Sequence, residues 1–425
     1  MRILLTANAS YVPPRGGATR SNLIWLDRMA RAGHASRIVC GASGGEGGGK
    51  AAGLGYHESI TVLAVEDPAR RLLTLRQQIR EFRPDWVLVS SEDLGHLLLR
   101  EAQQGAPGRL VYLAHTPQFF PFGPASWNPD PQGAELVAQA AAVVAIGQHM
   151  AEYIARSLEF ALERSLARPV VVIHPPIYGP GPYPNYASFE RGFLTMINPC
   201  AVKGISIFLE IAGRLPEYQF AAIPGWGTTS EDRRALERVP NIRLLPNPKD
   251  IDQLLAQTRL LLNPALWYEG FGLIVMESML RGIPVVASDS GGLKEAKRGT
   301  GYVIPVHTIE RFDPVFDEHA MPRPVIEQNS AAPWVAAVRE LLTDRAAYER
   351  ESASSRQAAA RFVSGLDAGD LERLLESLEP TGPARSGDSG RLPAGRAAPH
   401  ITMESLSPEK RALLLERLRK RQAGR

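Results

Sequence analysis

The stretch Asn263–Gly292 reads NPALWYEGFGLIVMESMLRGIPVVASDSGG, and the rest of the chain can be arranged around it. Apolar residues at helical spacing fill Leu273–Leu280, and Arg281-Gly282 follows as a typical helix end. The apolar run Ile283–Ala287 then predicts a short buried strand. A helix therefore lies between two glycine-rich loops at one edge of a parallel sheet, which is where α/β proteins bind ligands.

Two carboxylates in this stretch suggest a ligand site. Glu269 precedes the predicted helix, and Glu277 lies roughly one and a half turns into it. Gly270 and Gly272 let a ligand approach the backbone, and the helix start at Gly272-Leu273 offers free N–H groups to a phosphate. Two carboxylates that accept hydroxyl hydrogen bonds on either side of a diphosphate suit a nucleotide-sugar. The spacing alone fits an amphipathic helix with one solvated and one capping Glu equally well.

Composition restricts the class of protein. The chain has 425 residues, of which 44% are hydrophobic and 22% charged, and this indicates a globular protein with room for two domains. A net charge of +3 is too small to indicate a nucleic-acid partner. The two cysteines, Cys40 and Cys200, predict neither a disulfide framework nor a metal cluster, and we expect a cytoplasmic protein. The run Arg2–Thr6 is too short for a signal peptide, and no stretch approaches the ~18 apolar residues of a membrane span.

The first half of the chain alternates strands and helices. It begins with the strand Arg2–Thr6, a loop ending in Gly16-Gly17, the helix Ala18–Ala32 and the strand Ser36–Cys40. Gly16-Gly17 either presents backbone N–H groups to a diphosphate or forms a tight turn, and no G-x-G-x-x-G pattern is present. The low-complexity segment Gly41–Gly55 is expected to be mobile.

Two further features of the first half suit a binding edge. His115 directly follows the predicted strand Leu110–Ala114, where it could bond a sugar hydroxyl or a developing charge, although a lone His is more often structural. The aromatic and proline-rich loop Phe119–Pro129 could shape an acceptor cleft. The proline-rich run Ile177–Asn185 predicts a boundary between two halves with a cleft between them.

The second half repeats the alternation. After the strand Phe193–Ile197, Lys203 stands at the start of the helix Ile205–Arg214, where it either pairs with a phosphate or is a surface lysine. Asp250-Ile251-Asp252 resembles a D-x-D metal site, but we interpret it as a helix N-cap followed by a first-turn acid. Glu310–Arg323 is a polar insertion bounded by prolines.

At these residues the sequence resembles the GT-B glycosyltransferases of the family 4 type. Glu269–Glu277 matches the E-x7-E signature of that family, and the resemblance covers about Met1–Val363. Five further elements follow in the order of the family: Gly16-Gly17, His115, Lys203-Gly204, Gly225-Trp226-Gly227 and Gly291-Gly292.

The resemblance implies an α/β GT-B fold, in which two Rossmann-like domains face a central cleft. The predicted parts are an acceptor domain at 1–176, a nucleotide-sugar domain at 186–345, helices crossing back to the first domain at 346–378, a flexible linker at 379–404 and an amphipathic basic helix at 405–425. That last helix could dock on a partner protein, lie on an anionic membrane surface or be a frayed, solvated tail.

The resemblance also implies a retaining, metal-independent glycosyltransferase that needs no cofactor and uses a nucleotide-diphosphate sugar as donor. By resemblance, Glu277 contacts the ribose, Glu269 the donor sugar, Lys203 the leaving phosphate and His115 the sugar. The implied catalytic residues are His115, Lys203 and Glu269. The implied donor-binding residues are Gly16, Gly17, Asn198, Gly225, Gly270, Phe271, Gly272, Leu273 and Glu277.

Two residues depart from the pattern of the family. Asn198 stands where an Arg is usual, five residues before the Lys, and Gly147 stands where a Ser is common. A catalytically weak relative that binds or scaffolds is therefore an alternative, as is a membrane-bound lipid glycosyltransferase. The tail, LSPEKRALLLERLRKR, resembles the linker helices of nonribosomal peptide and polyketide synthases. This suggests an assembly-line partner and a peptide, polyketide or glycan acceptor.

Overall fold

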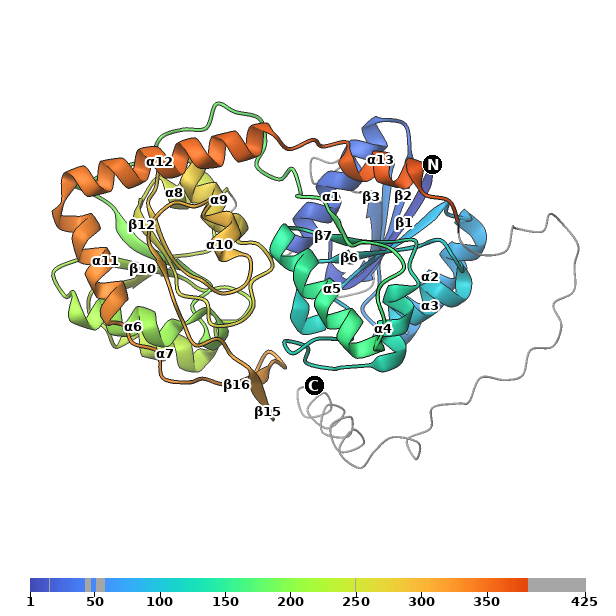
Figure 1. Cartoon of the computed structure of the whole chain (residues 1–425), viewed down its shortest axis with the longest axis horizontal. Coiled ribbons are helices and arrows are strands. Elements are labelled where there is room, and N and C mark those ends of the chain that lie inside the picture. The colour runs from blue at the N-terminus through green and yellow to red at the C-terminus, as the bar shows by residue number, and fades with distance from the viewer. Residues whose placement is uncertain (15, 43–46, 51–57, 249, 381–425) are drawn as a thin grey trace, which may run out of the picture. The chain divides into compact units, whose positions relative to one another are not determined.

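The computed structural model describes residues 1–14, 16–42, 47–50, 58–248 and 250–380. All of them lie in one compact unit, and two α/β sheets form its core, as the sequence predicts (Figure 1). Residues 381–404 of the predicted linker, the predicted basic helix at 405–425 and most of the segment Gly41–Gly55 lie outside the described residues.

The first sheet has eight strands in the order β3-β4-β2-β1-β5-β6-β7-β8. These are β1 Arg2–Ser10, β2 Ala35–Gly41, β3 Gly47–Lys50, β4 Ile60–Ala64, β5 Trp86–Ser90, β6 Leu110–Ala114, β7 Ala142–Ala145 and β8 Val171–Val172. Neighbouring strands run parallel, except that β3 pairs antiparallel with β4. Every residue of β5 and of β6 is buried, as expected of central strands that helices cover on both faces.

Helices cover both faces of this sheet. They are α1 Gly16–Arg31, α2 Pro68–Phe82, α3 Leu97–Gly105, α4 Pro131–Ala138 and α5 Gln148–Leu162, together with the 3-10 helix η2 Pro117–Phe119. Leu5 of β1 shares a core with Leu23 of α1, whereas Leu4 shares a second core with Leu75 of α2. One strand supplies both cores because its successive side chains point to opposite faces.

The second sheet is parallel and has six strands in the order β11-β10-β9-β12-β13-β14. These are β9 Phe193–Ile197, β10 Phe220–Ile223, β11 Ile242–Leu244, β12 Thr258–Asn263, β13 Val285–Ser288 and β14 Val303–Ile304. Its helices are η3 Ala201–Lys203, α6 Ile205–Arg214, α7 Ser230–Glu237, α8 Ile251–Leu255, α9 Leu273–Leu280, α10 Leu293–Ala296 and α11 Ala332–Thr343.

The strand order explains where a ligand can bind. In the second sheet the chain starts at β9, moves outward to β10 and β11, and then returns to place β12 on the other side of β9. The first sheet reverses in the same way between β1 and β5. In Rossmann-like sheets, ligands bind outside the carboxyl ends of the strands at this point of reversal. The loops that follow β9 and β12 carry Lys203 and Glu269, respectively.

Some elements differ from the prediction. Glu310–Arg323, a polar insertion bounded by prolines in which no strand was predicted, contributes most of an antiparallel hairpin formed by β15 Arg311–Phe316 and β16 Pro322–Val325. The short helices α4, α7 and α10 were not predicted. Asp250 caps α8 by accepting a hydrogen bond from the backbone N–H of Asp252, which confirms the N-cap interpretation.

Two helices follow the second sheet, α12 Arg345–Ser364 and α13 Asp370–Ser377. Ser352 of α12 bonds the carbonyl of Gly282, at the end of α9, at 2.6 Å. The indole N–H of Trp86 in β5 bonds the carbonyl of Leu375 in α13 at 2.9 Å, so the last described helix packs on the first sheet. Within the described ranges, the protein has no helix both long and apolar enough to cross a membrane.

Candidate active site

Lys203 and Glu269 meet where the loops after β9 and β12 come together. The Nζ of Lys203 forms an ion pair with Oε1 of Glu269. The indole N–H of Trp267 donates to the same oxygen at 2.9 Å, and the Lys203 ammonium lies 4.7 Å from the centre of the Trp267 ring. The sequence analysis singled out Lys203 and Glu269 separately as candidate site residues, and in the structure they form an ion pair. Trp267 was not predicted, although it stands only two residues before Glu269.

Glycines hold this corner in place. Gly204 has φ +80°, and a Cβ there would lie 2.0 Å from the carbonyl oxygen of Pro264. A Cβ on Gly270 would lie 2.4 Å from the carbonyl oxygen of His115, so the first half touches the corner directly. Gly272, with φ +107°, is the N-cap of α9, and no described side chain caps the helix there. The first N–H groups of α9 therefore suit an anion, as predicted from the sequence.

Glu277 lies on α9 and is only 5% exposed. Its Oε1 is 3.4 Å from Nη2 of Arg20, which belongs to α1 in the first half. Burial raises the pKa of Glu277, and the charges of Arg20 and Arg281 oppose this rise. Arg20 was not predicted. The feature that could have drawn attention to Arg20 is its position, since it is a basic residue in the first turns of the helix that begins at Gly16.

Gly16 and Gly17 begin α1. Gly16 has φ +82°, a left-handed conformation that glycine adopts without strain. A Cβ on Gly17 would lie 2.6 Å from Cδ1 of Leu273, the first residue of α9. The glycine pair of the first half therefore lies against the N-terminus of the helix that carries Glu277.

His115 is buried directly after β6. Its Nε2–H donates to Oδ1 of Asn22 in α1 at 2.8 Å, and Nδ2 of Asn22 donates to the hydroxyls of Tyr11 and Ser90. Burial lowers the pKa of His115 to about 3, so its ring is neutral at physiological pH. The contact of His115 with a sugar stays a prediction, and Asn22 is a polar neighbour that the sequence did not reveal.

Asn198 directly follows β9 and has a left-handed conformation with φ +54°. Its Oδ1 accepts hydrogen bonds from the N–H of Gly227, at 2.9 Å, and from the hydroxyl of Thr228, at 3.4 Å. Its Nδ2 is buried and has no hydrogen-bond partner among the described residues. A Cβ on Gly225 would lie 2.7 Å from Oδ1, so Asn198 and the loop after β10 fit closely.

Phe271 points into the protein. Its ring is buried, 5.7 Å from the ring of Phe362 in α12 and 5.3 Å from that of His174. Any contact of Phe271 with a donor would therefore use its backbone.

The structure also accounts for Gly147, the N-cap of α5. Glu295 of α10 accepts hydrogen bonds from the N–H groups of Gln148 and His149 and lies 3.1 Å from Nε2 of His174. Burial alone would raise the pKa of Glu295, but these hydrogen bonds outweigh it and lower the pKa. A Cβ on residue 147 would lie 3.0 Å from Oε2 of Glu295, so the carboxylate takes the place of a capping serine.

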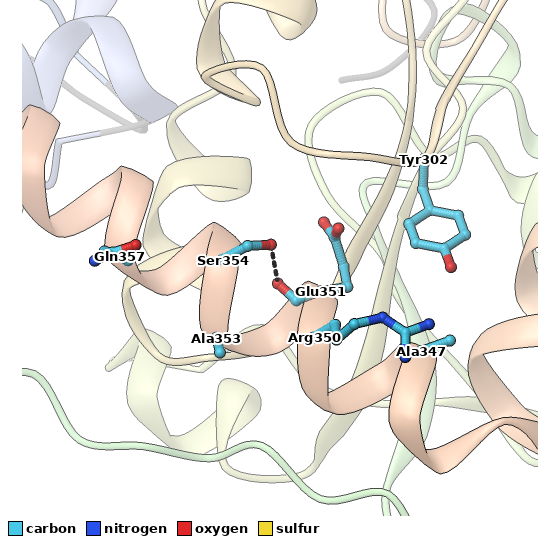
Figure 2. A pocket seen from close by; sticks show the side chains of 7 residues that line it. All are labelled: Tyr302, Ala347, Arg350, Glu351, Ala353, Ser354 and Gln357. Carbon is cyan, nitrogen blue, oxygen red and sulfur yellow. Dashed lines mark hydrogen bonds between the residues drawn. The ribbon is translucent and has the colours of Figure 1, made fainter.

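Two other features lie apart from these loops. A pocket of about 760 Å³ lies beside α12. It is lined by Tyr302, Ala347, Arg350, Glu351, Ala353, Ser354 and Gln357 (Figure 2). Its Glu351 pairs with the fully buried Lys297 at 2.9 Å, so this carboxylate supports packing. Elsewhere, His34, Glu372 and Glu376 bring possible metal-ligand atoms within 4.8 Å of one another, but Glu372 is already hydrogen-bonded to His34 at 2.9 Å.

Comparisons with family models match both halves. The model described as "Glycosyltransferase Family 4" matches residues 15–178, and the model described as "Glycosyl transferases group 1" matches residues 191–313. The search of curated proteins found no match.

Solved structures share the fold. HepE of Anabaena, solved with UDP and glucose, is 16% identical with a TM-score of 0.63, covering 89% of this chain and 100% of HepE. The sucrose-phosphate synthase of Thermosynechococcus elongatus is 14% identical with a TM-score of 0.64, covering 88% of this chain and 96% of the synthase. WaaG, a glycosyltransferase of lipopolysaccharide biosynthesis, is 15% identical with a TM-score of 0.58, covering 90% of this chain and 100% of WaaG.

Proposed function

Because the chain belongs to the GT-B glycosyltransferases of the family 4 type, we propose that it moves a sugar from a nucleotide-diphosphate sugar to an acceptor hydroxyl, with retention of anomeric configuration. The observation that carries this proposal is the Lys203–Glu269 pair, in the loops at the reversal between β9 and β12. UDP-sugars are the first donors to test, since HepE was solved with UDP-glucose.

We place the diphosphate at the N-terminus of α9, beside Lys203. The free N–H groups at Gly272 and the helix dipole favour an anion there. When the bond to the sugar breaks, negative charge develops on the leaving phosphate, and the Lys203 ammonium stabilises it. Glu269, relieved of part of its pairing with Lys203, accepts hydrogen bonds from hydroxyls of the donor sugar. These residues supply charge stabilisation without a metal.

We assign the ribose to Glu277. Its carboxylate is an acceptor for hydroxyl groups, and the charge of Arg20 opposes the rise in pKa that burial causes. The neutral His115 uses Nε2–H for Asn22, so its Nδ1 is the nitrogen that can accept a hydrogen bond from the donor sugar.

A catalytically weak, scaffolding relative is the second candidate, and Asn198 favours it. The residue carries no charge where the family usually has an Arg, so Lys203 is the cation that this proposal relies on beside the phosphate. The acceptor, a peptide, polyketide or glycan, and a partner bound through residues 405–425 also belong to the proposal.

Donor hydrolysis tests the proposed function. The protein is incubated with a panel of UDP-, GDP-, ADP- and TDP-sugars, and release of the nucleoside diphosphate is measured. We expect release with at least one donor and a thermal shift with the matching nucleoside diphosphate. The absence of both with every nucleotide tested would support the scaffolding candidate.

A further inference from the structure

Aromatic side chains from separate loops surround the Lys203–Glu269 pair. Trp267 contacts both members of the pair. Its ring centre lies 5.5 Å from that of Trp226, in the loop after β10, and 6.5 Å from that of Trp127, in the loop after η2. A row of three indoles therefore runs from the first half to the second, past the residues that we place at the donor sugar.

Trp226 is the open end of this row. It is 50% exposed, although large aromatic side chains are usually well buried. Hydrogen bonds fix the loop that carries it on both sides. Oδ1 of Asn198 accepts from the N–H of Gly227 and from the hydroxyl of the buried Thr228, and that hydroxyl accepts from the N–H of Gly225. A rigid, half-exposed indole beside a polar site is typical of a surface on which a ligand ring stacks.

The antiparallel hairpin β15–β16 brings a further aromatic side chain to this row. Phe312 of β15 meets Trp127 edge-on, with ring centres 5.5 Å apart. The hairpin is also tied to the loop and helix that follow Trp226, because Glu318 accepts hydrogen bonds from the N–H and hydroxyl of Ser230 at 2.6 and 2.7 Å. The family model ends at residue 313, so most of the hairpin lies beyond the part of this chain that matches it.

Unsatisfied polar atoms lie among these rings. In the part of the chain that the structure describes, Nε1 of Trp127 and Oε1 of Gln118 are buried without a hydrogen-bond partner. A buried polar atom without a partner is costly, and such groups often mark a place where a ligand completes the bonding. A simple phenol has one hydroxyl group, which is the group to be glycosylated. A pyranose ring has an apolar C–H face for the indole and hydroxyl groups for the donor and the acceptor.

We propose that Trp226, Trp127 and Phe312 form the acceptor subsite, and that the acceptor is a pyranoside, free or part of a glycan, whose ring stacks on Trp226. This inference rests on the proposed glycosyltransferase function and names its acceptor class. In the transfer, the acceptor hydroxyl oxygen bonds to the anomeric carbon of the donor sugar. The bond from that carbon to the diphosphate oxygen breaks, its electron pair stays with the nucleoside diphosphate, and the hydroxyl proton passes to a phosphate oxygen.

The test compares Trp226→Ala and Trp226→Phe with the wild-type protein, with Phe160→Ala as the control. Phe160 is an aromatic residue of α5 that is 88% exposed, and we assign it no part in the site. Each protein receives a donor that it hydrolyses, alone and with methyl glucoside, methyl galactoside, methyl mannoside or a simple phenol. Nucleoside diphosphate release measures turnover, and mass spectrometry measures the glycosylated product.

We expect at least one pyranoside to be glycosylated. The ratio of transfer to donor hydrolysis should fall at least tenfold in Trp226→Ala through a higher acceptor KM, stay near wild type in Trp226→Phe and be unchanged in Phe160→Ala. Donor hydrolysis with transfer only to the phenol, with no transfer, or with an unaltered ratio in Trp226→Ala would overturn the acceptor assignment alone. The absence of donor hydrolysis in the wild-type protein would overturn the proposed function and this inference together.

Discussion

The carboxylate of Glu295 accepts a hydrogen bond of 2.8 Å from the backbone N–H of His149, so a residue of the second half caps a helix of the first. Gln148 donates a second bond at 3.0 Å. The N-terminus of a helix has unpaired N–H groups and the positive end of the dipole, both of which favour a carboxylate. Glu295 thus supplies to α5 what a serine at position 147 would supply within the helix.

Replacing Glu295 with Ala should lower the free energy of unfolding by about 1–2 kcal/mol, the usual effect of losing an N-cap. Adding Gly147→Ser to that variant should restore only part of the loss. The serine can then cap α5 without meeting the carboxylate, but its Cβ would still lie 3.1 Å from Cδ2 of Phe271. Urea denaturation of the single and double variants measures both effects. Glu349→Gln, on the exposed face of α12, is the control. A loss that Gly147→Ser does not reduce would argue against the capping role.

Arg20 and Glu277 should act together in donor binding. Glu277→Ala should raise the donor KM about tenfold, the effect of losing about 1.4 kcal/mol of binding. Burial raises the pKa of Glu277, and the charge of Arg20 opposes that rise. Arg20→Ala should therefore raise the pKa of Glu277 further. The pH below which donor KM increases should then shift upward, because the protonated carboxyl is a poorer hydroxyl acceptor. Donor KM measured from pH 5 to 8 checks this, and an unshifted profile would contradict the coupling.

His115 should make the protein less stable in acid. Its pKa is about 3 in the folded protein, against an ordinary value near 6.5, so the unfolded chain takes up a proton that the folded chain refuses. Stability from this group is complete above pH ~6.5 and falls as the pH drops towards the folded pKa, by about 2 kcal/mol at pH 5. His115→Gln should be less stable at pH 7 yet lose less stability between pH 7 and 5. Urea denaturation at both pH values measures the free energy of unfolding. Equal losses of stability in the wild-type protein and in His115→Gln between pH 7 and 5 would contradict a buried, neutral His115 ring.

Lys203 should act on the chemical step. Lys203→Ala should lower kcat by ~10²–10³, the usual effect of removing one group that stabilises developing charge. Lys203→Arg keeps the charge and should retain more activity than Lys203→Ala. Donor hydrolysis at saturating donor measures kcat for both variants, and thermal unfolding shows whether each is folded. A folded Lys203→Ala variant with wild-type kcat would remove Lys203 from the mechanism.

The fold and the central pair of the site could be predicted because their signals are local. Apolar runs and glycine-rich turns mark the strands and loops. Lys203 and Glu269 stand in segments that follow strands, and Glu277 stands within the helix after Glu269. The contact between Lys203 and Glu269 could not be derived from spacing, since it depends on β9 and β12 becoming neighbours. The proline-rich run Ile177–Asn185 suggested two halves with a cleft between them. The resemblance to the family implied that these halves are two Rossmann-like domains facing that cleft.

The residues that the sequence did not reveal work across long distances in the chain. Arg20 meets Glu277 across 257 positions, and Glu295 meets Gln148 across 147 positions. The spacing of apolar residues along the chain indicates helices and strands, but it does not indicate which distant residues come into contact. The hairpin was missed for a different reason: Pro314, Pro322 and Pro324 weaken a strand prediction, because proline cannot donate to the ladder. The polar helix α7 has few apolar residues from which to infer a period.

Restoring the arginine that the family usually has at position 198 should not improve the enzyme. Asn198 has φ +54°, a conformation that Asn tolerates better than Arg, and its Oδ1 holds the N–H of Gly227. Asn198→Arg should therefore cost about 2 kcal/mol of stability, from the left-handed backbone and the lost hydrogen bond, and should displace the loop that carries Trp226. We expect a lower denaturation midpoint and a lower kcat for donor hydrolysis. Asn198→Asp keeps the size and the Oδ1 acceptor and should retain the loop, so it separates the conformational effect from that of charge. An Asn198→Arg variant with higher kcat and unchanged stability would show instead that the phosphate site lacks a cation.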